Sequence, residues 1–113
     1  MLRSLAFILL LTLSACKLLQ DRTEDQQDWS ANKFYSEAKE KLNEGNYTAA
    51  IKLYESLEAR YPYGRIAQQA QLEIAYAHYK NEEHASAIAA TDRFIKLHPN
   101  HQNVDYAYYI KAL

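Results

Sequence analysis

The single cysteine of this 113-residue chain, Cys16, is the residue best placed for covalent chemistry. It follows a short positively charged start and an apolar run over residues 5–13. A run of that length is typical of an export signal and is too short to cross a bilayer as a helix. Ser14 and Ala15 place small side chains directly before the thiol. The sequence therefore predicts a signal peptide over residues 1–15.

The segment Leu13-Ser14-Ala15-Cys16 resembles a bacterial lipobox. The resemblance implies cleavage before Cys16, diacylation of its thiol and acylation of the new amine. Several acyl chains would hold the protein firmly at a membrane, since each buried methylene contributes about 0.8 kcal/mol. Lys17, unlike an aspartate there, is permissive for transport to the outer membrane in Gram-negative lipoproteins. The alternative is an ordinary secretory signal with a cysteine that has no such role.

Other residues do not form a catalytic or metal-binding pattern. The sequence contains no nucleophile elbow, phosphate-binding loop or zinc motif. The four histidines have no acidic or cysteine partner at ligand spacing. A net charge of −1 without a basic cluster also disfavours a nucleic-acid partner. We expect a protein that is not an enzyme and holds no cofactor or metal.

The elements that would position a binding surface follow from a repeat with an offset of 37 residues. Ala38, Ala50, Ile51 and Pro62 recur as Ala75, Ala87, Ile88 and Pro99. Helical periodicity predicts helices over residues 31–44, 47–60, 65–80 and 84–97, and a fifth from about residue 103. The predicted organisation is a polar tether (16–29), repeat 1 (30–62), repeat 2 (65–99) and the start of a truncated repeat 3 (103–113).

Local signals support these boundaries. Ser30 is suited to cap the first helix, and Gly45 can adopt the left-handed conformation that ends it. The second repeat makes the same turn at residues 81–83 without a glycine. Trp29 is expected to cover the first helix. Ala87, Ile88, Thr91 and Phe94 are expected to face the core of the second repeat.

Small residues in both helices, Gly-Asn-Tyr at the turn and a closing proline resemble the tetratricopeptide repeat. The fold class that this resemblance implies is an all-α helical solenoid of two repeats plus the start of a third. The alternative is a generic helical bundle. A solenoid needs about three repeats for stability, so the sequence suggests the N-terminal part of a longer repeat protein.

In the repeat register, the first helix of each repeat would line a concave groove. Tyrosines, amides and lysines there suit an extended peptide, because rings accept side chains, amides pair with backbone groups and a lysine pairs with a carboxylate. Several of these tyrosines could instead pack against neighbouring helices. The candidate groove residues are Asn32, Tyr35, Lys39, Asn43, Gln69, Leu72, Tyr76, Tyr79, Lys80, Tyr106 and Tyr109.

Five stretches together resemble the BamD (ComL) family of outer-membrane protein assembly factors. They are Arg60-Tyr61-Pro62-Tyr63-Gly64, Gln68-Gln69-Ala70-Gln71-Leu72, Ala75-Tyr76-Ala77-His78-Tyr79-Lys80, Asp92-Arg93-Phe94-Ile95-Lys96-Leu97-His98-Pro99 and Asn103-Val104-Asp105-Tyr106. The resemblance implies a lipoprotein on the periplasmic face of the outer membrane. It also implies three sets of partners: a BamA-like barrel subunit, companion lipoproteins and unfolded outer-membrane protein segments.

The sequence departs from that family in length, since its members usually carry five repeats. Two other repeat lipoproteins remain as alternatives, one of pilus biogenesis and one that coordinates envelope constriction. A lipid-anchored hydrolase is a third alternative of a different class, although the chain shows no catalytic constellation.

Overall fold

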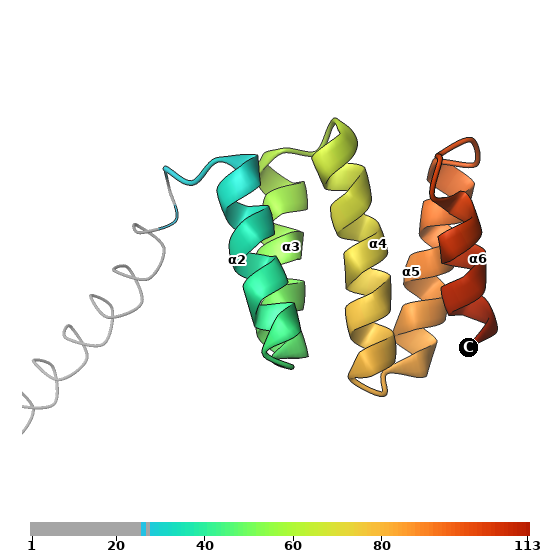
Figure 1. The fold of residues 1–113 in the computed structure, drawn as a ribbon. Helices are drawn as coiled ribbons and strands as arrows, with labels where there is room; N and C mark the ends of the chain where they lie inside the picture. Colours follow the sequence, from blue (N-terminus) through green and yellow to red (C-terminus); the bar gives the residue numbers. More distant parts are fainter. Residues whose placement is uncertain (1–25, 27) are drawn as a thin grey trace, which may run out of the picture.

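The computed structural model of the chain describes residue 26 and residues 28–113 (Figure 1). That part contains five α-helices and no strand. They are α2 (Ala31–Asn43), α3 (Tyr47–Arg60), α4 (Arg65–Lys80), α5 (His84–Leu97) and α6 (Val104–Ala112). All five helices agree with the sequence prediction to within about one residue. The predicted signal peptide, Cys16 and most of the predicted tether lie outside the described residues.

The helices form two layers. Each helix packs against the next in the chain, and α2 also contacts α4, as α4 contacts α6. The backbones of α3 and α5, in contrast, do not come into contact. The first helices of the repeats therefore form the inner layer of a curved stack, and the second helices form the outer layer. The helices run up and down side by side, which is the predicted tetratricopeptide-like solenoid (Figure 1).

Small residues allow the close approach within each pair. Ala38, Ala50 and Ala75 are completely buried, and Ala87 is almost so. The buried side chains form two clusters. The first is centred on Phe34, Tyr54 and Leu57, and the second on Leu72, Phe94 and Ala107.

The predicted burial of Ile88 is wrong, because 44% of its surface is exposed. Its counterpart Ile51 belongs to the first cluster together with Ile74 and Ala77 of α4. The α6 residue that lies 37 positions after Ile74 is Lys111, whose ammonium group pairs with Asp92 at 2.6 Å. A charged residue in α6 therefore takes the place of the isoleucine that helps to cover Ile51, and Ile88 remains partly exposed.

The segment before α2 is fixed to the end of α3. Trp29 lies against Phe34 with 5.1 Å between ring centroids, so it covers the first helix as predicted. The Tyr61 hydroxyl donates a hydrogen bond of 2.7 Å to the carbonyl of Trp29, and the Arg60 guanidinium donates to the carbonyl of Gln26. Ser30 accepts a hydrogen bond from the Lys33 amide and caps α2. These contacts close the outer end of the first repeat.

The two turns within the repeats share one backbone geometry. The amide of Asn46 donates to the Lys41 carbonyl at 2.9 Å, and 37 residues later Glu83 donates to His78 at the same distance. The residue before each donor has a left-handed backbone conformation: φ is +80° at Gly45 and +60° at Glu82. This is a Schellman-type helix end, which favours glycine because a Cβ is strained there. The second repeat thus builds the same turn with an unfavourable residue.

We expect Glu82→Gly to raise the free energy of unfolding by about 0.5–1 kcal/mol. Glycine relieves the left-handed strain, and the greater freedom of the unfolded chain offsets part of that gain. Urea denaturation monitored by circular dichroism would measure the change. The matched control is Gly45→Ala, whose new Cβ would meet nothing within 4 Å, so its expected loss comes from the backbone alone. A lower stability of Glu82→Gly would contradict this account.

Candidate functional groove

Two adjoining hollows lie along the face formed by α2, α4 and α6, which we call the inner groove. The central hollow has a volume of about 740 Å³ and the neighbouring one about 620 Å³, and Gln69 lines both. The central hollow is lined by Lys39, Leu42, Asn43, Tyr47, Gln69, Glu73, Tyr76, Lys80, Asn103 and Tyr106. The neighbouring hollow is lined by Asn32, Tyr35, Arg65, Ile66, Gln68, Gln69, Asn100, His101 and Gln102.

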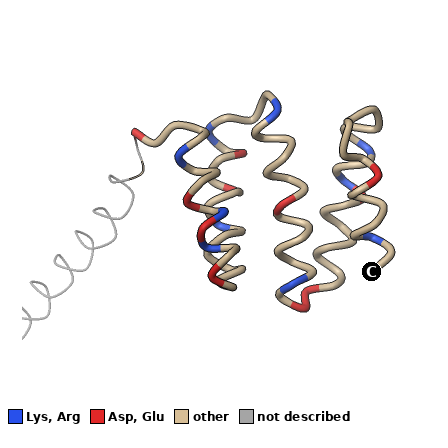
Figure 2. The backbone as a smooth tube through the Cα atoms, in the orientation of Figure 1, with Lys and Arg blue, Asp and Glu red and all other residues tan. Residues whose placement is uncertain are grey.

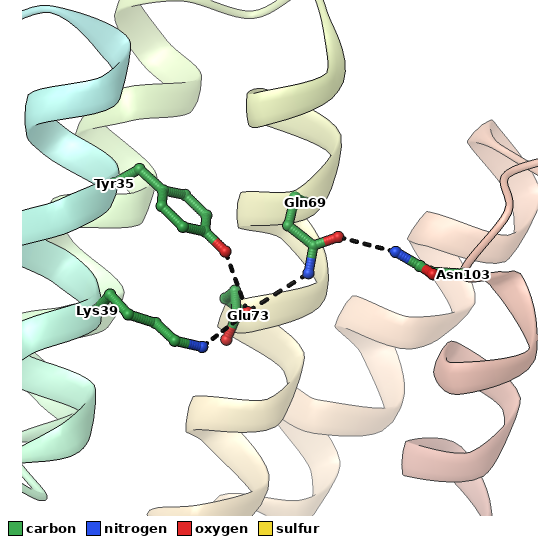
Figure 3. A network of polar contacts seen from close by, with 5 residues as sticks. All are labelled: Tyr35, Lys39, Gln69, Glu73 and Asn103. Atoms are coloured by element: carbon green, nitrogen blue, oxygen red, sulfur yellow. Dashed lines mark hydrogen bonds and ion pairs between the residues drawn. The ribbon is translucent and has the colours of Figure 1, made fainter.

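Glu73 of α4 lies at the centre of a polar network in this groove (Figure 3). Its Oε1 accepts hydrogen bonds from the Tyr35 hydroxyl at 3.3 Å, Lys39 Nζ at 3.3 Å and Gln69 Nε2 at 3.4 Å. Gln69 Oε1 in turn accepts from Asn103 Nδ2 at 3.1 Å. The network therefore connects α2, α4 and the start of α6. Only 12% of the Glu73 side chain is exposed.

The negative charge of Glu73 acts on the surrounding tyrosines. Burial, then the nearby Glu73 carboxylate, raises the pKa of Tyr35 to about 12. The same two causes, with Tyr76 and Tyr109 contributing less, raise the pKa of Tyr106. Both hydroxyls therefore remain protonated at physiological pH, so they can donate hydrogen bonds within the groove.

Lysine and arginine positions are interspersed with aspartate and glutamate positions along the helices (Figure 2). Three charged residues line the central hollow: Lys39, Lys80 and Glu73. Lys39 pairs with Glu73, whereas Lys80 has no acidic group within 4 Å in the described part of the chain. The hollow combines one paired lysine, one unpaired lysine and one carboxylate with aromatic walls.

The structure brings most of the predicted groove residues together. Asn32 and Tyr35 line the neighbouring hollow, and Lys39, Asn43, Tyr76, Lys80 and Tyr106 line the central one. Tyr109 lines neither. Its ring is 6.2 Å from that of Tyr106 in a stacked arrangement, and 60% of the residue is exposed.

Two predicted groove residues of α4, Leu72 and Tyr79, line neither hollow. Leu72 is completely buried in the second core cluster with Phe94 and Ala107. Tyr79 packs its ring against His84 at the start of α5, 5.9 Å between centroids, and lines neither hollow. Successive residues of an α-helix are rotated by about 100°. Relative to Tyr76, Leu72 and Tyr79 therefore lie on one side, toward α5, and Glu73 lies on the other.

Sequence reasoning missed Glu73, Tyr47 and Asn103. Glu73 follows Gln69 by four residues and precedes Lys80 by seven. These spacings place all three side chains on one face of the helix, so the predicted positions of Gln69 and Lys80 could have indicated Glu73 as well. Tyr47 belongs to the second helix of its repeat, which was not expected to reach the groove. Asn103 precedes α6, and no local signal connects it to Gln69.

The histidines do not gather into a site in the described residues. His98 and His101 both lie against the Phe94 ring, with centroids 5.3 and 5.2 Å away. Burial, with His101 and Arg93 nearby, lowers the pKa of His98. Residue 26 and residues 28–113 contain no group of three or more potential metal ligands, and no helix among them is long and apolar enough to cross a membrane.

Comparison with known proteins gives one family. The model of a family described as outer membrane lipoprotein (YfiO) matches residues 27–113. An outer membrane protein assembly factor BamD of Neisseria meningitidis serogroup B is 53% identical over 106 residues, covering 91% of this chain and 40% of the relative. The BamD of Vibrio cholerae is 38% identical over 86 residues, which cover 76% of this chain and 36% of the relative. The BamD of Caulobacter vibrioides is 35% identical over 79 residues, which cover 70% of this chain and 26% of the relative. The chain thus spans at most about two fifths of these relatives.

Proposed function

Because this chain belongs to the YfiO family of outer membrane lipoproteins, whose matched relatives are named BamD assembly factors, we propose that it takes part in assembling β-barrel proteins at the outer membrane. In this proposal its repeats hold an unfolded segment of a barrel protein in the inner groove. The observation that carries this is the groove itself, where tyrosines and amides from α2, α3, α4 and α6 line the hollow that holds the Glu73 network.

The groove suits an extended strand on chemical grounds. Strands of outer-membrane barrels alternate apolar and polar side chains. Tyr47, Tyr76 and Tyr106 offer ring surface for the apolar ones, and Asn43 and Asn103 offer amide groups for the backbone. An extended residue spans about 3.3 Å, so a peptide of several residues can pass along both hollows.

The remaining features of the proposal rest on the family and on the N-terminal sequence. Cys16 would carry the lipid that tethers the chain to the periplasmic face of the outer membrane. The partners would be a BamA-like barrel subunit and companion lipoproteins. The role would be non-catalytic: binding and positioning, without a cofactor. Family membership favours this reading over pilus biogenesis, envelope constriction and lipid-anchored hydrolysis.

A photo-crosslinking amino acid at Tyr76 is expected to capture peptides taken from the transmembrane strands of a porin. Tyr76 is half-buried and lines the central hollow, so a bound strand would pass within reach of its ring. Mass spectrometry of the crosslinked product would identify the peptide and the attachment site.

The control places the same crosslinker at Tyr108, which lies on α6 with 54% of its surface exposed and lines neither hollow. Greater exposure should favour random capture at Tyr108, whereas a groove site should favour Tyr76. Equal labelling from both positions would count against a peptide site in the inner groove.

A further inference from the structure

The three donors around Glu73 all bind the same oxygen. Tyr35, Lys39 and Gln69 converge on Oε1, and no described residue donates a hydrogen bond to Oε2. Oε2 is also not among the buried unpaired polar atoms of the described residues, so it reaches solvent. Since Glu73 lines the central hollow, this second oxygen is the part of the carboxylate that a bound molecule can meet.

The surroundings hold this acceptor in position before a ligand arrives. Among the residues that the structure describes, Glu73 is the only carboxylate that lines the central hollow, and its side chain is mostly buried at the contact of α4 with α2. Contacts from two helices restrict its rotation. A carboxylate held in this way forms strong hydrogen bonds to donors, and it repels another carboxylate at the same distance.

We propose that Glu73 Oε2 determines which peptides the inner groove accepts, by binding a hydrogen-bond donor of the peptide and rejecting an acidic side chain at that point. The ligand class is an extended peptide with an amide or another hydrogen-bond donor opposite Glu73. This inference rests on the proposed function, since it assumes that the groove binds peptide, but it assigns a specific contact and a selectivity that the family does not supply.

An acidic group on the same peptide would have a different place. Lys80 follows Glu73 by seven residues, about 10 Å along the helix axis, on nearly the same face of α4. That separation corresponds to about three residues of an extended chain. The groove therefore discriminates by position: a carboxylate is excluded at Glu73 and tolerated near Lys80.

The test exchanges glutamate and glutamine, which have the same shape, both in the peptide and at residue 73 of the protein. A porin strand peptide with a fluorescent label is made in versions that carry glutamine or glutamate at each polar position in turn. Fluorescence anisotropy gives the affinity of each version for the full chain. At the position that faces Glu73, we expect the chain to bind the glutamine version about tenfold more tightly, the effect of one hydrogen bond to a charged group.

Glu73→Gln changes this preference without changing the shape of the side chain. Its amide oxygen can keep the three donors of Oε1, and its NH₂ group then replaces Oε2 as a donor toward the peptide. The tenfold preference for glutamine should disappear or reverse. Glu55→Gln, an equal charge change on α3 that lies outside the inner groove, should leave the preference unchanged.

A second variant covers the case in which Glu73→Gln disturbs the fold. Lys39→Met removes the cation paired with Glu73 and leaves Oε2 in place, so the preference for glutamine should widen. If the glutamine and glutamate versions bound equally well at every position, the inference would be overturned, but the proposal that the groove binds peptide would stand. A preference that is unchanged in Lys39→Met would have the same consequence. Failure of the unmodified chain to bind any strand peptide would overturn both the inference and the proposed function.

Discussion

Leu72→Ala is expected to lower the free energy of unfolding by about 2–5 kcal/mol, the cost of removing a buried leucine side chain and leaving a cavity. Leu72 is completely buried, and its cluster joins α4 to α5 and α6 through Phe94 and Ala107. The total stability of a domain of this size is about 5–15 kcal/mol, so the loss is a large fraction of it. Thermal and urea unfolding followed by circular dichroism would measure the change.

Leu97→Ala provides the matched control. The chemical change is identical, but Leu97 at the end of α5 is 55% exposed, so its expected effect is within about 0.5 kcal/mol. The pair of variants also separates the two roles considered for Leu72. If Leu72→Ala were as stable as Leu97→Ala but bound strand peptides more weakly, Leu72 would be a groove contact and the core assignment would fail.

Cys16→Ser is expected to abolish lipid attachment of the chain. Serine lacks the thiol that would carry the diacyl group in the proposed modification. In a Gram-negative host, mass spectrometry should find an acylated N-terminal peptide that begins at Cys16 in the unmodified chain. The variant should yield no acylated peptide.

Ser14→Ala is the control for this change. It keeps a small residue before the cysteine and should leave acylation intact, which shows that the effect of Cys16→Ser comes from the thiol. An unmodified Cys16 in chain recovered from the membrane fraction would contradict the lipoprotein assignment.

Much of the fold could be read from the sequence because its signals are local. The 37-residue offset, the Ser30 cap and the stop at Pro62 each act within a turn or two of helix. These features predict all five helices in the described residues to within about one residue. The same features predict the tight pairing of helices, since small residues at equivalent positions leave room for close approach.

The inner groove was only partly predictable, for a geometric reason. Local periodicity shows that one face of α4 is apolar, but it does not show which sector turns toward α2 and which toward α5. Leu72 and Glu73 are neighbours in the chain, and a rotation of about 100° separates them. The packing of α4 between its neighbours decides that Leu72 enters the core and that Glu73 enters the groove.

The sequence by itself thus determined the helices, the repeat, the candidate lipid site at Cys16 and the family. Only the tertiary structure decided that Tyr35, Lys39 and Gln69 converge on one oxygen of Glu73, and that Ile88 remains exposed. Tyr35 and Lys39 lie 38 and 34 residues from Glu73, and only the stacking of α2 on α4 brings them together. Local signals act within a few residues, whereas such contacts depend on the angle and register between helices.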